Sequence, residues 1–109
     1  MDAQQLKGHL DLLLLAALER GPSYGGQIIA DVQAATGGYF SLREGTLYPA
    51  LHRLEKAGWI EGEFRQLPRG GSLVKVYRLT PGGREELRAQ RERYERFSAA
   101  VRGVIGGRA

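Results

Sequence analysis

The first apolar pattern of the chain lies in residues 4–20, where leucine and alanine recur at steps of three and four residues. This spacing predicts a helix, and Gly21-Pro22 is a typical helix stop. Leu12 and Leu15 make the apolar stripe wider than one helix face. Such a helix is either wholly internal or meets a second surface. Because the chain is short, we favour a contact between the two subunits of a dimer.

A second, weaker helix is predicted for residues 23–36, with Ser23 as its N-cap and Gly37-Gly38 after its end. Gly25 and Gly26 fall in its first turn, where glycine lowers helix propensity. Two glycines there indicate either the close approach of another backbone or the tolerance of a first turn.

A third helix is predicted for residues 42–57. Ser41 and Glu44 have the spacing of a capping box, and Gly58 follows the last turn. One apolar ridge holds this helix to the core, formed by Leu47, Leu51 and Leu54. Pro49 conflicts with a straight helix. Either the helix is kinked there, or it begins nearer Thr46 and Pro49 lies in its first turn.

Two strands are predicted next, at residues 60–66 and 73–80, joined by a turn that contains proline and two glycines. In the second strand Tyr77 and Leu79 share one face, which we expect to point inward. Trp59, just before the first strand, is expected to fill the space between the third helix and the hairpin.

The last helix is predicted for residues 82–105, with Thr80 as N-cap and Pro81 at the first helical position. Two sets of positions seven residues apart form a seam: Leu87, Tyr94 and Val101, and Gln90, Phe97 and Val104. The other faces are highly charged. The seam therefore packs either on its own domain or, as we prefer, on a second copy across a two-fold axis.

The order of elements is that of a winged helix-turn-helix, an α+β fold that is mostly α. We expect residues 1–80 to form a DNA-binding domain and residues 81–109 a long C-terminal dimerisation helix within the same compact unit. A chain of 109 residues leaves room for one domain.

Composition excludes several classes of function. The chain has no cysteine, and its longest strongly apolar run, Leu12 to Leu18, is too short to span a membrane or act as a signal peptide. A cytoplasmic protein is expected. His9 and His52 share no spacing with a nucleophile or with metal ligands, and no phosphate-binding loop is present. We therefore expect no enzyme activity, no cofactor and no metal.

Charge points to nucleic acid. Residues 1–42 hold two basic and four acidic residues, whereas residues 43–109 hold fourteen basic and eight acidic ones. Residues 65–78 contain no acid and four bases: Arg65, Arg69, Lys75 and Arg78. An acid-free basic hairpin is the electrostatic footprint of a phosphate-binding wing.

The outward side of the third helix offers a mixture of donors, rings and bases suited to the DNA major groove: Arg43, Thr46, Tyr48, Pro49, His52 and Arg53. Two of these have alternative interpretations. Tyr48 is a candidate for the core, and Arg53 for a surface ion pair with Glu55 or Glu19.

The stretches GTLYPALHRLEKAGWIEGEF and KVYRLTPGG resemble the PadR family of bacterial transcriptional regulators, and LLLLAALERGPSYGGQI resembles its first two helices. The resemblance covers about residues 10–84 and is closest to the short, single-domain subgroup. It implies a homodimeric repressor that binds double-stranded DNA at a pseudo-palindromic operator. DNA contacts would then fall on Tyr24, Thr46, Tyr48, Pro49, Arg53 and Lys75. Gly25-Gly26 departs from the family, whose members often have a bulkier residue before the position of Gln27.

Two rival functions remain open. Some short family members bind flat aromatic compounds between their long helices, so a small aromatic inducer is a candidate ligand. It would lie in a seam formed by Leu6, Leu10, Leu13, Leu87, Tyr94, Phe97 and Val101. The other rival is a winged-helix module that binds protein and has lost DNA binding.

Overall fold

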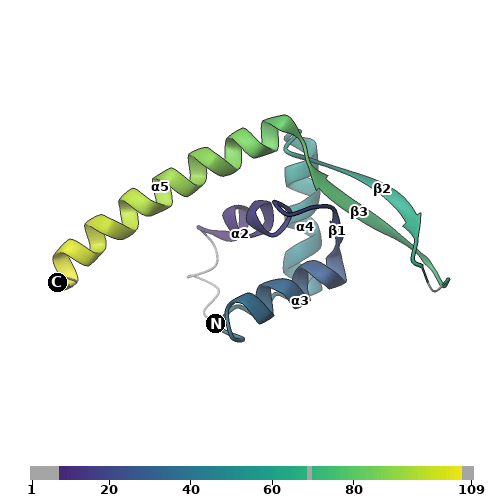
Figure 1. Cartoon of the computed structure of the whole chain (residues 1–109), viewed down its shortest axis with the longest axis horizontal. Coiled ribbons are helices and arrows are strands. Elements are labelled where there is room, and N and C mark those ends of the chain that lie inside the picture. Colours follow the sequence, from purple (N-terminus) through teal and green to yellow (C-terminus); the bar gives the residue numbers. More distant parts are fainter. Residues whose placement is uncertain (1–7, 69, 107–109) are drawn as a thin grey trace.

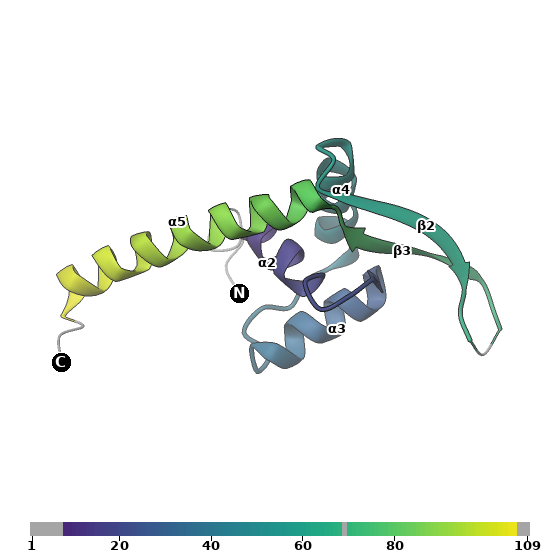
Figure 2. The same ribbon diagram turned by 45° about the horizontal axis from the view of Figure 1, so that its top comes forward.

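The computed structural model describes residues 8–68 and 70–106, which form three short helices, a three-stranded sheet and one long helix (Figure 1). The elements are α2 (Leu10–Ala17), β1 (Ser23–Tyr24), α3 (Gly25–Ala35), α4 (Glu44–Lys56), β2 (Ile60–Gln66), β3 (Leu73–Leu79) and α5 (Pro81–Ile105). Helices α2, α3 and α4 cluster together, and the β2–β3 hairpin and α5 extend from this cluster in opposite directions (Figures 1 and 2). This arrangement confirms the α+β, mostly helical, winged helix-turn-helix fold.

The core lies where α2, α3 and α4 meet the inner ends of the hairpin and α5. α4 supplies the predicted ridge, α2 inserts Leu14 and Leu15 against it, and Leu18 follows directly after the helix. β3 adds Tyr77 and Leu79, both buried, as their shared face predicted. A single apolar cluster therefore joins the three helices to the base of the hairpin.

The three short helices are shorter than their patterns suggested. α2 ends at Ala17, because Leu18 already has a non-helical backbone, and the predicted part before residue 8 lies outside the described residues. α4 begins at Glu44 and continues through Pro49, so Pro49 is not in the first turn. Proline at this position leaves the carbonyl of Gly45 without its helical partner. Gly45 is exposed, so water can bind that carbonyl.

Two predicted caps are wrong. The residue before α4 is Arg43 and the residue before α3 is Tyr24, and neither helix has a side-chain cap bond. Ser23 instead belongs to β1, a two-residue strand that the sequence analysis missed. β1 pairs with β3, and β3 pairs with β2, in an antiparallel sheet of order β1-β3-β2. Backbone pairing of Ser23 with Tyr77 thus replaces the capping role expected for its side chain.

The junction between hairpin and α5 is as predicted. Pro81 is the first residue of α5, and the Thr80 hydroxyl accepts a hydrogen bond from the Gly83 amide at 3.0 Å. The same hydroxyl donates to the Gly58 carbonyl at 2.6 Å. A methyl group at Gly83 would lie 1.9 Å from the Trp59 carbonyl oxygen. The start of α5 therefore packs directly on the backbone that links α4 to the hairpin.

Candidate nucleic-acid interface

The α4 helix has one buried side and one exposed side. Its ridge of Leu47, Leu51 and Leu54, together with Ala50, is buried in the core. The residues predicted to face outward are all exposed: Arg43, Thr46, Tyr48, Pro49, His52 and Arg53. Tyr48 is 42% exposed, which excludes the alternative of a core tyrosine. The structure thus places one polar and aromatic surface on the outside of α4.

Tyr48 extends from α4 to the start of α3. A methyl group at Gly25 would lie 2.3 Å from the Tyr48 hydroxyl oxygen, so only glycine leaves room for this ring. Beside it, a methyl at Gly26 would lie 3.3 Å from the ring of Tyr24. The approach of another backbone expected at the two glycines is therefore not seen, and aromatic side chains lie there instead. Tyr24 directly precedes α3, and the ring of Tyr48 reaches the first residue of that helix from α4.

Arg53 forms an ion pair that the sequence analysis did not identify. Its Nη2 atom donates to Oδ1 of Asp11 on α2 at 2.8 Å. The two acids considered as its partners are engaged elsewhere, Glu55 with Lys75 and Glu19 with Arg91. No sequence pattern signals this pair, because the two residues are far apart along the chain.

Lys75 joins the hairpin to α4. Its Nζ donates to Oε1 of Glu55 at 3.0 Å and lies over the rings of Phe64 and Tyr77, 5.8 and 5.5 Å from their centroids. The hydrogen bond to Glu55 raises the pKa of Lys75. A methyl group at Gly62 would lie 2.7 Å from the Lys75 side chain. Lys75 thus lies flat along the hairpin, with its charge directed at α4.

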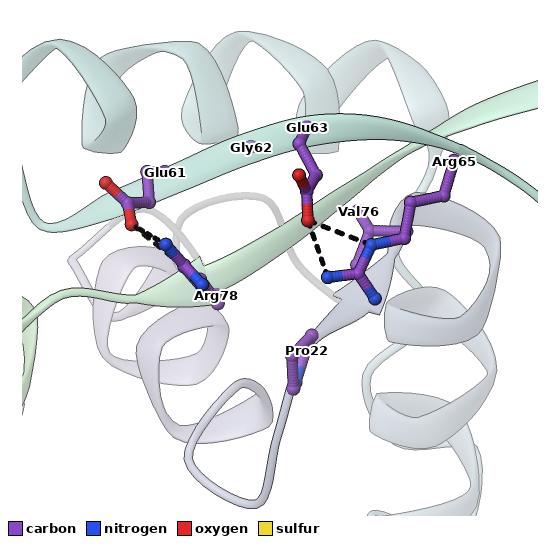
Figure 3. Close-up of a pocket in the computed structure, with 7 residues that line it drawn as sticks. All are labelled: Pro22, Glu61, Gly62, Glu63, Arg65, Val76 and Arg78. Carbon is purple, nitrogen blue, oxygen red and sulfur yellow. Dashed lines mark hydrogen bonds and ion pairs between the residues drawn. The ribbon is translucent and has the colours of Figure 1, made fainter.

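The opposite face of the hairpin has two ion pairs, Glu61 with Arg78 and Glu63 with Arg65 (Figure 3). Arg65 donates to one oxygen of Glu63 through Nε at 3.0 Å and Nη2 at 2.6 Å, which lowers the pKa of Glu63. With Pro22, these side chains line a shallow hollow of about 170 Å³.

Because of these pairs, the hairpin is not the acid-free wing that the sequence predicted. The acids that pair with the two arginines precede residue 65 in the sequence, and the antiparallel register brings them alongside: Glu61 lies opposite Arg78. The bases of the described hairpin are therefore all paired with acids. The fourth base, Arg69, lies outside the described residues.

The predicted seam divides into two parts. Leu87 is only 2% exposed and belongs to the core of its own domain. Beyond it, α5 exposes an apolar stripe formed by Tyr94, Phe97, Val101, Val104 and Ile105. On α2, Leu10 and Leu13 are partly buried, and Leu6 lies outside the described residues.

A cleft of about 360 Å³ separates α2 from the middle of α5. His9 and Tyr94 meet there edge to face, with ring centroids 5.5 Å apart, and Asp11 and Phe97 also line it. Within residues 8–68 and 70–106, no group of side chains has the arrangement of a metal site. In the same ranges, no helix has the length and hydropathy needed to cross a membrane.

Comparison with known proteins identifies the family. Residues 14–89 match the model of the transcriptional regulator PadR-like family. The transcriptional regulator Rv3488 of Mycobacterium tuberculosis is 41% identical over 68 residues, which is 62% of this chain and 59% of that protein.

Two solved structures have the same fold along almost the whole chain. A transcriptional regulator from Clostridium thermocellum has a TM-score of 0.86 and 27% identity, covering 96% of this chain and 98% of that one. A PadR-like regulator from Bacillus cereus has a TM-score of 0.83 and 26% identity, covering 97% and 100%. The chain therefore belongs to the PadR-like family of transcriptional regulators, which are DNA-binding proteins and not enzymes.

Proposed function

We propose that this protein is a homodimeric repressor that binds a pseudo-palindromic operator through α4 and the hairpin. The exposed side of α4 carries the proposal, because it combines hydroxyl, aromatic and guanidinium groups on a helix whose other side is buried. A helix of this kind fits a major groove about 12 Å wide, and its side chains can reach base edges. Repression would follow from occlusion of a promoter.

Within this surface the residues have different roles. Thr46, Tyr48 and Arg53 would contact the major groove, flanked by Arg43, Pro49 and His52. Tyr24, the residue before α3, would contact the DNA backbone beside the same groove. Hydrogen bonds to phosphate set the position of a protein on DNA, whereas contacts to base edges set its sequence preference.

The hairpin would contact phosphates through Arg65 and Arg69. The partner of Arg65 is the exposed carboxylate of Glu63, and exposed ion pairs contribute little free energy. Exchange of Glu63 for a phosphate therefore has a small cost. Lys75 was also a candidate, but its bond to Glu55 favours a structural tie between the hairpin and α4.

The proposed dimer rests on the apolar stripe of α5. Phe97 is 60% exposed and Val104 86% exposed, an unfavourable arrangement for a single chain in water. Residues 1–80 would form the reading domain, and residues 81–109 would pair with the same helix of a second copy. On the operator the two α4 helices of the dimer would lie about 34 Å apart, one turn of DNA, or a small multiple of that distance.

DNA binding is tested with a duplex selected by the purified protein from a random pool. Arg53→Ala should lower affinity for the selected duplex about 10- to 100-fold, because one good side-chain contact to a base discriminates by about 1–3 kcal/mol. Arg65→Ala should weaken binding to all duplexes alike and reduce the salt dependence. If no duplex is retained, the protein is a winged-helix module of another kind. If both variants bind like the parent, the reading surface lies elsewhere.

The dimer is tested by sedimentation. Phe97→Glu places a charge in the stripe and should convert the dimer to a monomer, with loss of affinity for the two-site operator. Arg96→Glu introduces the same residue outside the heptad seam and should leave the dimer intact. A dimer that persists in Phe97→Glu would exclude the stripe as its interface.

A second role, the sensing of a planar aromatic compound, is favoured by the cleft between α2 and α5, which is lined by three rings: His9, Tyr94 and Phe97. Binding of a planar dye should then be lost in Tyr94→Ala and kept in Tyr39→Ala, whose ring lies elsewhere. Equal binding by both variants would exclude the cleft.

A further inference from the structure

The ion pair between Arg53 and Asp11 links the exposed side of α4 to α2. Arg53 Nη2 donates to Asp11 Oδ1 at 2.8 Å. The Arg53 side chain is 59% exposed and that of Asp11 33%. Exposed pairs of this kind add little to folding stability. The contact therefore has more consequence for where the guanidinium lies than for whether the chain folds.

The geometry leaves most of the guanidinium available. Arginine has five N–H donors in a rigid planar fork, and in the part of the chain described here Asp11 is its only hydrogen-bond partner. One donor is held by the carboxylate, and Nε and Nη1 remain for an incoming acceptor. Because the guanidinium of Arg53 is rigid and planar, the contact that holds one edge also sets the direction of its free edge.

We propose that Asp11 is a positioning residue for DNA recognition: it holds Arg53 from the side of α2 so that the free edge of the guanidinium is directed at the DNA. The inference rests on the proposed function. A long, flexible arginine side chain loses rotamer freedom when it binds, and a contact that already limits this freedom lowers the cost of binding. Asp11 would thus raise sequence preference without contacting DNA.

A second ion pair, formed close to the end of α2, provides a matched control. Glu19, just after α2, pairs with Arg91 of α5 at 2.7 Å, and both side chains are 45% exposed. This pair is as short and about as exposed as the pair of Asp11 with Arg53. It joins the segment after α2 to α5, however, and within the described residues neither Glu19 nor Arg91 forms a hydrogen bond or ion pair with α4. Loss of Glu19 removes a comparable ion pair without touching the reading surface.

The test is a double-mutant cycle on the duplex selected by the wild-type protein, with a scrambled duplex as reference. The measured quantity is the ratio of the two affinities. Asp11→Ala should lower this ratio about 3- to 10-fold, the size expected for directly coupled side chains. In the Arg53→Ala background the same substitution should change nothing further. Asp11→Glu, which keeps the carboxylate, should restore part of the ratio.

Glu19→Ala should leave the ratio unchanged, and thermal unfolding should show that each variant is folded. An unchanged or higher ratio in Asp11→Ala, or an equal loss in the presence and absence of Arg53, would overturn the positioning role while leaving the proposed function in place. A wild-type protein that prefers no duplex would instead overturn the proposed function and this role with it. An Arg53→Ala variant equal to wild type would overturn the recognition role of Arg53, and therefore the positioning role of Asp11, without overturning DNA binding.

Discussion

Helices α4 and α5 have the same amphipathic pattern, but α4 buries its apolar side and α5 exposes most of it. Each has an apolar ridge and a charged remainder. In α4 the ridge of Leu47, Leu51 and Leu54 is buried within its own domain. In α5 only Gly83 and Leu87, in the first turns, are buried. The rest of its ridge is the exposed stripe that ends at Ile105.

The difference concerns what each helix leaves exposed. α4 exposes polar and aromatic groups, which suit a polar and charged partner such as DNA. The outer part of α5 exposes apolar groups, which suit the same helix of a second copy. Amphipathic periodicity thus predicts that a helix has an apolar partner, and only the surrounding fold shows whether that partner lies in the same chain.

The largest expected effect is the difference in unfolding free energy between a substitution in the buried ridge of α4 and one in the exposed stripe of α5. Leu51→Ala creates a cavity in the core and should lower the free energy of unfolding by about 2–5 kcal/mol at every protein concentration. Val104→Ala should cost less than about 1 kcal/mol, because Val104 is exposed in the single chain. Urea denaturation at several protein concentrations measures both.

Under the proposed dimer, the small cost of Val104→Ala should disappear on dilution, since it acts through association. An equal cost for the two substitutions in dilute solution would contradict the division between the ridges.

An intermediate effect distinguishes the two ends of α5. Gly83→Ala would force a methyl group to within 1.9 Å of the Trp59 carbonyl oxygen and should destabilise the protein by about 1–3 kcal/mol. Gly103→Ala meets no atom within 4 Å and should stabilise the helix by about 0.5–1 kcal/mol. Thermal unfolding followed by circular dichroism compares them. Destabilisation by Gly103→Ala would show that its surroundings are closely packed, as in a tight dimer seam.

The smallest effect concerns the ion pair between Glu19, just after α2, and Arg91 in α5. A hydrogen bond from Arg91 lowers the pKa of Glu19 below its ordinary value of 4.5. A lowered pKa means that the pair contributes stability above the unfolded value, and that this contribution is lost as pH falls through the folded value. Glu19→Gln should therefore cost less than about 1 kcal/mol near neutral pH and nothing well below pH 4. Urea titrations at several pH values measure this, and a cost that grows on acidification would contradict the assignment.

Local patterns were sufficient for much of the fold. The bounds of β2, the cap formed by Thr80 and Pro81, and the buried face of α4 all follow from spacing within a few residues. Two caps were misassigned for the same reason: serine before a helix is a local preference, and Ser23 instead lies in a strand whose partner, Tyr77, is far along the chain. The candidate reading surface was predicted as a set of exposed residues, but not the contacts that hold them.

The sequence by itself determined the family, the order of the elements apart from β1, and the exposed side of α4, because these depend on periodicity and on short motifs. Only the tertiary structure decided the partners of individual side chains. It placed Asp11 against Arg53, Tyr48 over Gly25, and Glu61 and Glu63 beside the arginines of the hairpin. It also separated Leu87, in the core, from Phe97, in solvent. These outcomes depend on how distant segments are brought together, and that information is absent from any local window of the chain.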